Sequence, residues 1–167
     1  MARHFFALWP DAAAAAALAA LARELAEQSG GKPVPREKIH LTLAFLGEID
    51  PEAVERARGV AGAIRATAFE VRLDRTGSFR GARVGWAGCE SPAPGLIDLA
   101  AQLGQALKDA GFVLEERPFA PHVTLARRIR SAVARTPIAP IPWRASALAL
   151  VRSEAGRYET IGSWETR

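Results

Sequence analysis

His40-Leu41-Thr42-Leu43-Ala44 returns 82 positions later as His122-Val123-Thr124-Leu125-Ala126. The chain has three histidines, and these two pentapeptides contain two of them. In a β-strand successive side chains point to opposite faces, so residues i and i+2 share a face. Each pentapeptide therefore predicts a strand that presents one imidazole and one hydroxyl together and turns its apolar residues toward a core.

The segments that precede the two pentapeptides follow the same order. Residues 4–8 are apolar and predict a strand, and Asp11 stands where a helix N-cap is expected. The helix that follows runs to about Gln28 and closes at a glycine pair. In the second half, a Ser-Pro-Ala-Pro segment at 91–94 leads into another helix that runs to about Ala110.

The spacing of these segments indicates an internal duplication. A proline precedes each motif histidine by 30 residues, at Pro10 and at Pro92. A shared order of elements at equal spacing is typical of a repeated unit. We therefore expect a single domain over residues 1–167 with two pseudo-symmetric lobes, whose motifs lie at 40–43 and 122–125.

The rest of the chain predicts a further helix, two hairpins and a loop rich in proline and arginine. The expected ranges are a helix from Asp50 to about Ala66, strands at 69–73 and 83–87 with a turn near Gly77, a loop at 128–142, and a final hairpin at 147–152 and 158–164.

The composition is that of an ordinary globular protein, with 49% hydrophobic and 24% charged residues. The formal net charge is +4, and all but three of the 22 basic residues are arginines. Because arginine forms bidentate contacts with phosphate and stacks on bases, an anionic or nucleic-acid partner is expected. An arginine-rich genome would produce the same bias.

Cysteine content and apolar runs bear on the compartment. Cys89 is the single cysteine, so an intrachain disulfide is excluded and a reducing cytoplasm is expected. The apolar run at 12–22 has 11 residues, whereas a helix needs about 20 to span a bilayer. We expect a cytoplasmic monomer with no membrane segment and no obligate protein partner.

The paired histidines and threonines point to phosphoester cleavage. With an unperturbed pKa near ~6.5, an imidazole can take or give a proton near neutral pH. One imidazole would accept a proton from water and the other would protonate the departing sugar oxygen, while the threonine hydroxyls hold the non-bridging oxygens. This scheme requires no metal and no other cofactor.

The chain resembles the 2H phosphoesterase superfamily, and within it the RNA 2′,3′-cyclic phosphodiesterases historically called 2′-5′ RNA ligases. The resemblance rests on both motifs and on the blocks around them. These are Phe5-Phe6-Ala7-Leu8, Val34-Pro35, the run from His40 to Gly47, Gly77-Ser78-Phe79 with Trp86, the run from Pro118 to Arg127, and Leu148–Ser153 with Gly156, Tyr158 and Trp164.

The resemblance implies an α+β, bilobal duplicated fold with two antiparallel sheets, helices on the outside and an active-site groove between the lobes. Similar enzymes open an RNA 2′,3′-cyclic phosphate to a 2′-phosphate, so the 3′-oxygen leaves. Carried over by position, His40 is the proton donor and His122 the proton acceptor, with Thr42 and Thr124 beside them. The residues alone do not assign the two histidine roles.

Three further residues are candidates for substrate binding. Similar enzymes use an arginine at the position of Arg127, although strand alternation would turn Arg127 away from His122 unless the strand ends or bulges there. Alternation favours Arg128 instead. Phe45 occupies the equivalent position in the first motif, where it could stack on a base or lie in the core.

Other functions remain open at this point. The same residues would serve 2′-5′ RNA ligase or 2′-5′ phosphodiesterase activity, since a catalyst works in both directions. A non-catalytic module that binds RNA ends would use the same basic cleft. A metal site is the last alternative, although two distant histidines without a carboxylate cluster fit metal-ligand spacing poorly.

Overall fold

The computed structural model describes residues 2–166. Capping residues in the sequence determine where the helices begin and end. In α1 (Ala12–Ser29) the Asp11 side chain accepts a hydrogen bond from the Ala14 amide at 2.8 Å, and Gly30 ends the helix with a φ of 71°. In α2 (Pro51–Ala63) Asp50 caps the Ala53 amide at 2.7 Å. The N-cap predicted at Asp11 is confirmed, and the second helix begins at the predicted Asp50-Pro51 pair. The third helix, α3, spans Pro94–Asp109.

The strands pair antiparallel throughout, in the order β7-β4-β5-β6-β3-β1-β8-β9, and β2 adds to β6. Their bounds are β1 Arg3–Leu8, β2 Lys32–Pro33, β3 Leu41–Glu48, β4 Phe69–Phe79, β5 Val84–Gly88, β6 His122–Arg127, β7 Thr136–Ala145, β8 Ala147–Glu154 and β9 Arg157–Glu165. The α+β class, with an antiparallel sheet and helices, is as predicted.

The two motif strands lie side by side at the centre of this order. They join through one pair, Leu41 with Val123. This pair links a half formed by β3, β1, β8 and β9 to a half formed by β6, β5, β4 and β7. The strands therefore belong to one hydrogen-bonded sheet with a narrow junction, rather than to the two sheets that we expected.

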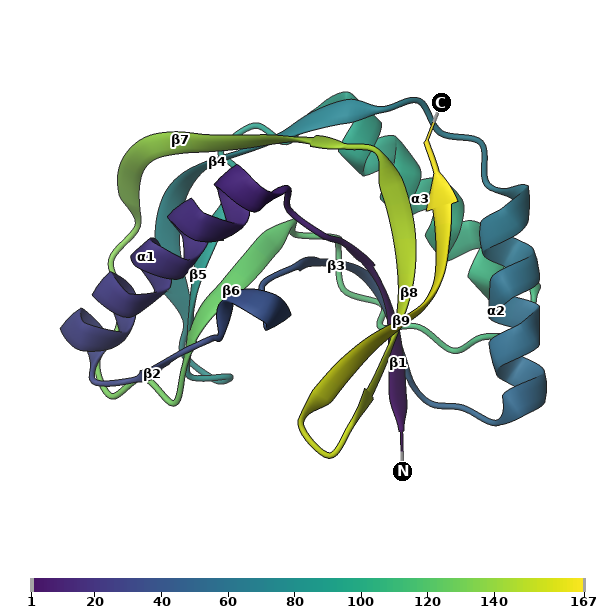
Figure 1. Cartoon of the computed structure of the whole chain (residues 1–167), viewed down its shortest axis with the longest axis horizontal. Coiled ribbons are helices and arrows are strands. Elements are labelled where there is room, and N and C mark those ends of the chain that lie inside the picture. The colour runs from purple at the N-terminus through teal and green to yellow at the C-terminus, as the bar shows by residue number, and fades with distance from the viewer. Residues whose placement is uncertain (1, 167) are drawn as a thin grey trace.

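Helices cover the apolar face of the motif strands. In Figure 1, α1 lies beside β2, β5 and β6, whereas α2 and α3 lie together on the other side of the molecule. Leu41 and Leu43 of β3 and Val123 and Leu125 of β6 are buried in the main core. Because side chains alternate along a strand, the histidines and threonines face away from this core. No helix within residues 2–166 is long and apolar enough to cross a membrane.

A smaller apolar cluster lies on the outer face of β1 and β8. It consists of Phe5, Ala7, Ala149 and Val151, and the half-buried Trp9 and Tyr158 pack against it. Phe5 of this cluster stacks on His40, so the first motif strand has apolar neighbours on both faces.

Two predicted ranges were wrong. The turn near Gly77 is absent because β4 continues through it to Phe79 and the chain turns at 80–83. A Cβ at Gly77 would lie 2.5 Å from Cζ2 of Trp86, so glycine serves here to let the indole pack on the backbone. The expected loop at 128–142 contains most of β7, whose prolines are tolerated because β7 is an edge strand.

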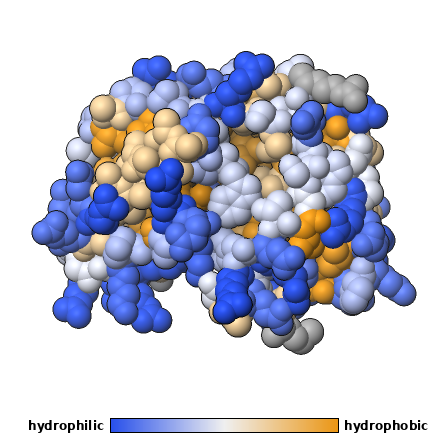
Figure 2. Space-filling model, in the orientation of Figure 1, coloured by the Kyte–Doolittle hydropathy of each residue, from blue (hydrophilic) through white to orange (hydrophobic). Residues whose placement is uncertain are grey.

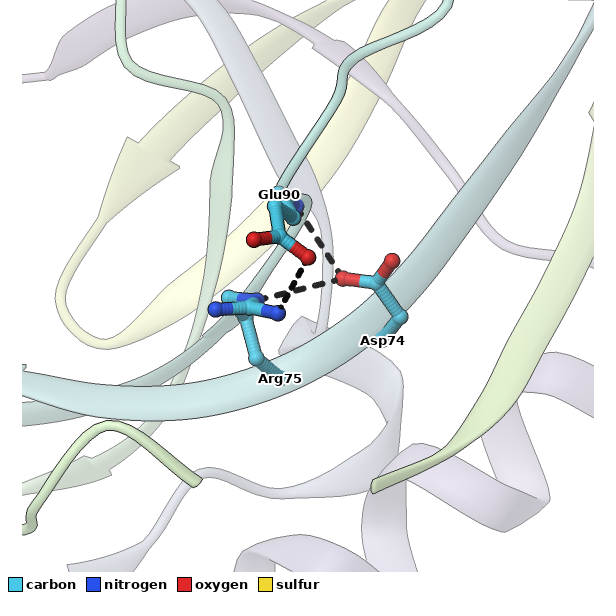
Figure 3. A network of polar contacts seen from close by, with 3 residues as sticks. All are labelled: Asp74, Arg75 and Glu90. Atoms are coloured by element: carbon cyan, nitrogen blue, oxygen red, sulfur yellow. Dashed lines mark hydrogen bonds and ion pairs between the residues drawn. The ribbon is translucent and has the colours of Figure 1, made fainter. Parts of the chain in front are cut away.

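An ion-pair network fastens the loop before α3 to β4 (Figure 3). Arg75 contacts Glu90 at 2.6 Å and Asp74 at 3.5 Å, and the Glu90 amide donates to Asp74 at 3.0 Å. Burial raises the pKa of the neighbouring Cys89 thiol, and the charge of Asp74 adds to this effect. The network holds the end of β5 in place, and β5 in turn pairs with the second motif strand.

Candidate active site

A cleft of about 170 Å³ opens where the two motif strands meet. It contains both histidines and both threonines of the repeated pentapeptide. The full lining is Phe5, Val34, Lys38, His40, Thr42, Phe45, His122, Thr124, Arg127 and Tyr158. Six of the seven predicted site residues are thus brought together, and Arg128 is the exception.

The register of the motif strands sets the two histidines on a diagonal. Because Leu41 pairs with Val123 in antiparallel fashion, His40 lies at the level of Thr124 and Thr42 at the level of His122. Each imidazole therefore has a hydroxyl along its own strand and another across the junction. A small anion between the strands would have imidazoles on two sides and hydroxyls on the other two.

The two imidazoles are held in the same way. The Nδ1 of His40 lies 2.6 Å from the Lys38 carbonyl oxygen, and the Nδ1 of His122 lies 2.8 Å from that of Ala120. A carbonyl oxygen can only accept, so each Nδ1 carries the proton and donates it. In the neutral rings Nε2 is then the basic nitrogen. The Nε2 of His40 lies 3.0 Å from the Thr42 hydroxyl.

His40 stands in an aromatic enclosure. The Phe5 ring stacks on it with centroids 4.7 Å apart, and Trp9 and Tyr158 present their edges at 5.6 Å. Burial among these rings lowers the pKa of His40 below its usual 6.5, and the charge of Arg127 lowers it further, against the hydrogen bond to Lys38, which raises it. His40 is therefore mainly neutral in the empty site near pH 7.

His122 has a more open setting. Its ring meets Phe79 edge to face at 5.1 Å, and Phe79 in turn packs on Trp86 at 5.5 Å. Phe79 is 37% exposed, whereas Phe5 is 5% exposed. Solvent therefore reaches the surroundings of His122 more easily than those of His40.

A β-bulge in each motif strand aims one more side chain into the cleft. Along β5 the consecutive residues Gly85 and Trp86 pair with Ala126 and Thr124, so Leu125 is the extra residue of β6. A bulge reverses the alternation that follows it, and Arg127 thereby reaches the cleft. The prediction that favoured Arg128 by strand alternation was therefore wrong. Arg128 lies beyond the strand end with a φ of 55°.

The first motif strand contains the same irregularity. Phe6 and Ala7 of β1 pair with Ala44 and Thr42, so Leu43 is the extra residue of β3. Phe45 consequently lines the cleft and is 51% exposed, which excludes the core position that we had considered for it. The two bulges stand at equivalent positions of the two pentapeptides.

Four lining residues were not predicted: Phe5, Val34, Lys38 and Tyr158. Lys38 had a usable signal, because it stands two residues before His40. Its ammonium nitrogen lies 5.3 Å from the centre of the Tyr158 ring. Tyr158 had no local signal, since only the pairing of β9 with β8 and of β8 with β1 brings it to the site.

The third histidine, His4, lies apart from the cleft. It is buried on β1, and its Nδ1 has no hydrogen-bond partner among the described residues. Burial lowers the pKa of His4, and the charge of Arg152 lowers it further. This buried position fits a structural residue and not a surface one. Within residues 2–166 no three His, Cys, Asp or Glu side chains gather as metal ligands would.

The chain is similar to several RNA 2′,3′-cyclic phosphodiesterases. It is 41% identical to that of Escherichia coli over 107 residues, which are 64% of this chain and 61% of the relative. It is 35% identical to that of Thermus thermophilus over 167 residues, covering 91% of this chain and 82% of the relative. The match to the Geobacillus stearothermophilus enzyme spans 46% of that relative, so part of the relatives' length has no counterpart in these alignments.

Solved structures agree with the sequence matches. Escherichia coli LigT complexed with 3′-AMP superposes with a TM-score of 0.86 at 31% identity, over 98% of this chain and 97% of that chain. TT0787 of Thermus thermophilus has a TM-score of 0.82 at 30% identity, over 99% and 98%. The family model of the 2′-5′ RNA ligase superfamily matches residues 9–157. The chain is therefore a member of the 2′-5′ RNA ligase superfamily.

Proposed function

We propose that this protein hydrolyses RNA 2′,3′-cyclic phosphate ends to 2′-phosphates, without a metal ion. The observation that carries the proposal is the pair of imidazoles, His40 and His122, each with Nδ1 fixed on a carbonyl and both lining one cleft with two hydroxyls. The curated relatives named above bear the same activity in their names.

In the proposed reaction His122 is the base and His40 the acid. The Nε2 of His122 accepts a proton from water as the water oxygen forms a bond to phosphorus. The bond from phosphorus to the 3′-oxygen breaks, and that oxygen takes the proton held by Nε2 of His40. The product has a 2′-phosphate and a 3′-hydroxyl. Before the next turnover His122 releases its proton to water and His40 takes one up.

The bound phosphate would prepare His40 for its role as the acid. Because burial disfavours the imidazolium in the empty site, His40 needs a nearby anion to become protonated. Once protonated, Nε2 no longer accepts from the Thr42 hydroxyl, so the Thr42 proton is free to point toward a phosphate oxygen and Nε2–H is available to the 3′-oxygen. Substrate binding and acid protonation would thus reinforce each other.

The remaining groups would hold the substrate. Thr42 and Thr124 would donate to the two non-bridging oxygens as charge builds on them. Arg127, which the bulge directs into the cleft, would pair with the phosphate. Phe45 offers an exposed ring on the opposite motif strand for the terminal base.

We also propose that the domain arose by duplication, with pseudo-symmetric lobes around motifs 40–43 and 122–125 and the site in the groove between them. The strand order supports this, because β3 and β6 are adjacent and each is followed outward by three further strands. The bulges at Leu43 and Leu125 support it independently, since they fall at the same position of both repeats.

The decisive experiment incubates the purified protein, in EDTA, with a short RNA that ends in a 2′,3′-cyclic phosphate. We expect the terminal nucleoside to carry a 2′-phosphate, identified by chromatography against authentic 2′- and 3′-nucleotides. A 3′-phosphate product would overturn the assignment of the leaving oxygen. Tight binding without product over hours would favour the RNA-end binding module, and a ligated 2′-5′ product would favour the ligase.

A further inference from the structure

Five exposed basic residues lie at the end of β6, which borders the cleft, and on the backbone next to it. They are Lys32, Arg83, Arg127, Arg128 and Arg130, and we call this set the basic ridge. Arg127 lies between two neighbouring strands, because it pairs with Lys32 of β2 on one side and with Val84 on the other. Figure 2 shows hydrophilic side chains along the lower left margin, where Figure 1 places β2.

The charges of the basic ridge are not neutralised within the described chain. All five residues are exposed. The ion pairs found within residues 2–166 are made by Arg58, Arg75 and Arg152, and none involves the basic ridge. Five neighbouring like charges repel one another, so an anionic partner would relieve this repulsion.

The backbone that carries the basic ridge is fixed. The amide of Arg130 donates to the carbonyl of Ser29, at the end of α1, at 2.7 Å. The amide of Ile129 donates to the Arg83 carbonyl at 3.1 Å, and Nε of Arg83 donates back to the Ile129 carbonyl at 3.2 Å. Arg83 and Arg128 both have a positive φ, of 54° and 55°, which surrounding contacts must hold. The basic ridge is therefore preorganised.

From these observations we infer that the basic ridge binds the phosphates of the RNA chain upstream of its cyclic end. Arg127 belongs both to the cleft and to the basic ridge, so the positive surface begins at the reacting phosphate and leads away from it. A single-stranded nucleic acid carries a charge at every residue and follows such a surface without sequence preference. This inference rests on the proposed function and adds to it that long substrates are favoured over mononucleotides.

The test compares two triple variants that remove the same charge. The ridge variant is Lys32→Gln, Arg128→Gln and Arg130→Gln, which spares Arg127 and the hydrogen-bonded Arg83. The control variant is Arg72→Gln, Lys108→Gln and Arg144→Gln, at exposed positions without ion pairs in the described residues. Each is assayed on a mononucleoside 2′,3′-cyclic phosphate and on an RNA of about 12 nucleotides with the same end.

We expect the ridge variant to retain kcat/KM on the mononucleoside within about twofold. On the RNA at about 50 mM salt it should lose roughly tenfold, while the control variant loses little, because three phosphate contacts are missing. The slope of log kcat/KM against log salt should fall by about 2, at about 0.7 for each single-strand phosphate contact. Equal losses in both triple variants, or no preference of the wild type for RNA, would overturn the inference.

A binding measurement separates this inference from the proposed function. The dissociation constant of a 2′-phosphate-ended RNA is measured for the wild type and for both triple variants as a function of salt. If the wild type fails to hydrolyse even the mononucleoside, the proposed function is wrong, and a selective loss of RNA affinity in the ridge variant would still support the basic ridge. An unchanged affinity in the ridge variant would reject it.

Discussion

The two motif strands share a backbone design and differ in what surrounds it. The histidine just before β3 and the histidine that begins β6 each donate Nδ1–H to the carbonyl two residues earlier, and a bulge follows at Leu43 or Leu125. The neighbouring strands then give the two histidines different surroundings. Strand β1 brings Phe5 against His40, whereas β5 brings the flat backbone of Gly88 opposite His122.

This difference shows how a repeated sequence can give two unequal groups. The repeat determines where each Nε2 points, and the partners from outside the repeat surround His40 with aromatic rings that disfavour its protonation. The bulges likewise give unequal results from equivalent positions. One directs an aromatic ring, Phe45, into the cleft, and the other directs a cation, Arg127.

The largest effect is expected from removing either histidine. His40→Ala and His122→Ala should each lower kcat by about 10³-fold, within the range typical of general acid and base catalysis. The two variants should differ on a substrate in which the 3′-oxygen is replaced by sulfur, since a thiolate leaves without being protonated. We expect this substrate to restore turnover in His40→Ala and not in His122→Ala.

His4→Gln serves as the control for that experiment, because His4 is buried away from the cleft. It should keep kcat near the wild-type value, and circular dichroism should show that all three variants are folded. Rescue of His122→Ala by the sulfur substrate would reverse the assignment of acid and base.

Loss of the hydroxyls should have the next largest effect. Thr42→Val and Thr124→Val should each reduce kcat by about 10²-fold, as for one donor to a developing anionic charge. Thr42→Ser and Thr124→Ser keep the hydroxyl and should retain most of the activity. Steady-state kinetics on the mononucleoside substrate provide the measurement, and a valine variant as active as its serine counterpart would contradict the role of that hydroxyl.

Substitution of Arg127 and of Arg128 should have clearly different effects on KM. Arg127→Gln should raise KM for the mononucleoside substrate by roughly tenfold, the low end for a charge-assisted hydrogen bond at an exposed site. Arg128→Gln should leave this KM within about twofold, because Arg128 lies outside the cleft. A larger effect at Arg128 than at Arg127 would mean that the bulge does not direct the side chain as described.

The sequence was sufficient for features set by local chemistry. Alternation in the two pentapeptides predicted which side chains face the cleft, and Asp11 and Asp50 predicted the helix starts. It was insufficient where a distant partner decides. Gly77 was predicted as a turn residue because the sequence does not show that Trp86 packs on it. Strand alternation misplaced Arg127 because no residue of the pentapeptide indicates the bulge at Leu125.

The smallest effect is expected on the protonation of His40 itself. In the free protein an NMR titration should give His40 a pKa below 6.5, mainly because burial disfavours the charged ring. Trp9→Ala opens one side of the aromatic enclosure to water, so the pKa of His40 should rise toward 6.5. Phe79→Leu alters the ring that packs on His122 and makes no change beside His40, so it should leave the His40 pKa unchanged.

Adding a 2′-nucleotide should raise the pKa of His40 in the same titration, since an anion favours the imidazolium. The sign of this shift matters for the mechanism. A neutral imidazole in the empty site can become the acid only if the substrate supplies the charge that protonates it. If the nucleotide lowered the pKa of His40 or left it unmoved, His40 would be suited to act as the base, and the unequal surroundings of the two histidines would assign the roles in the opposite sense.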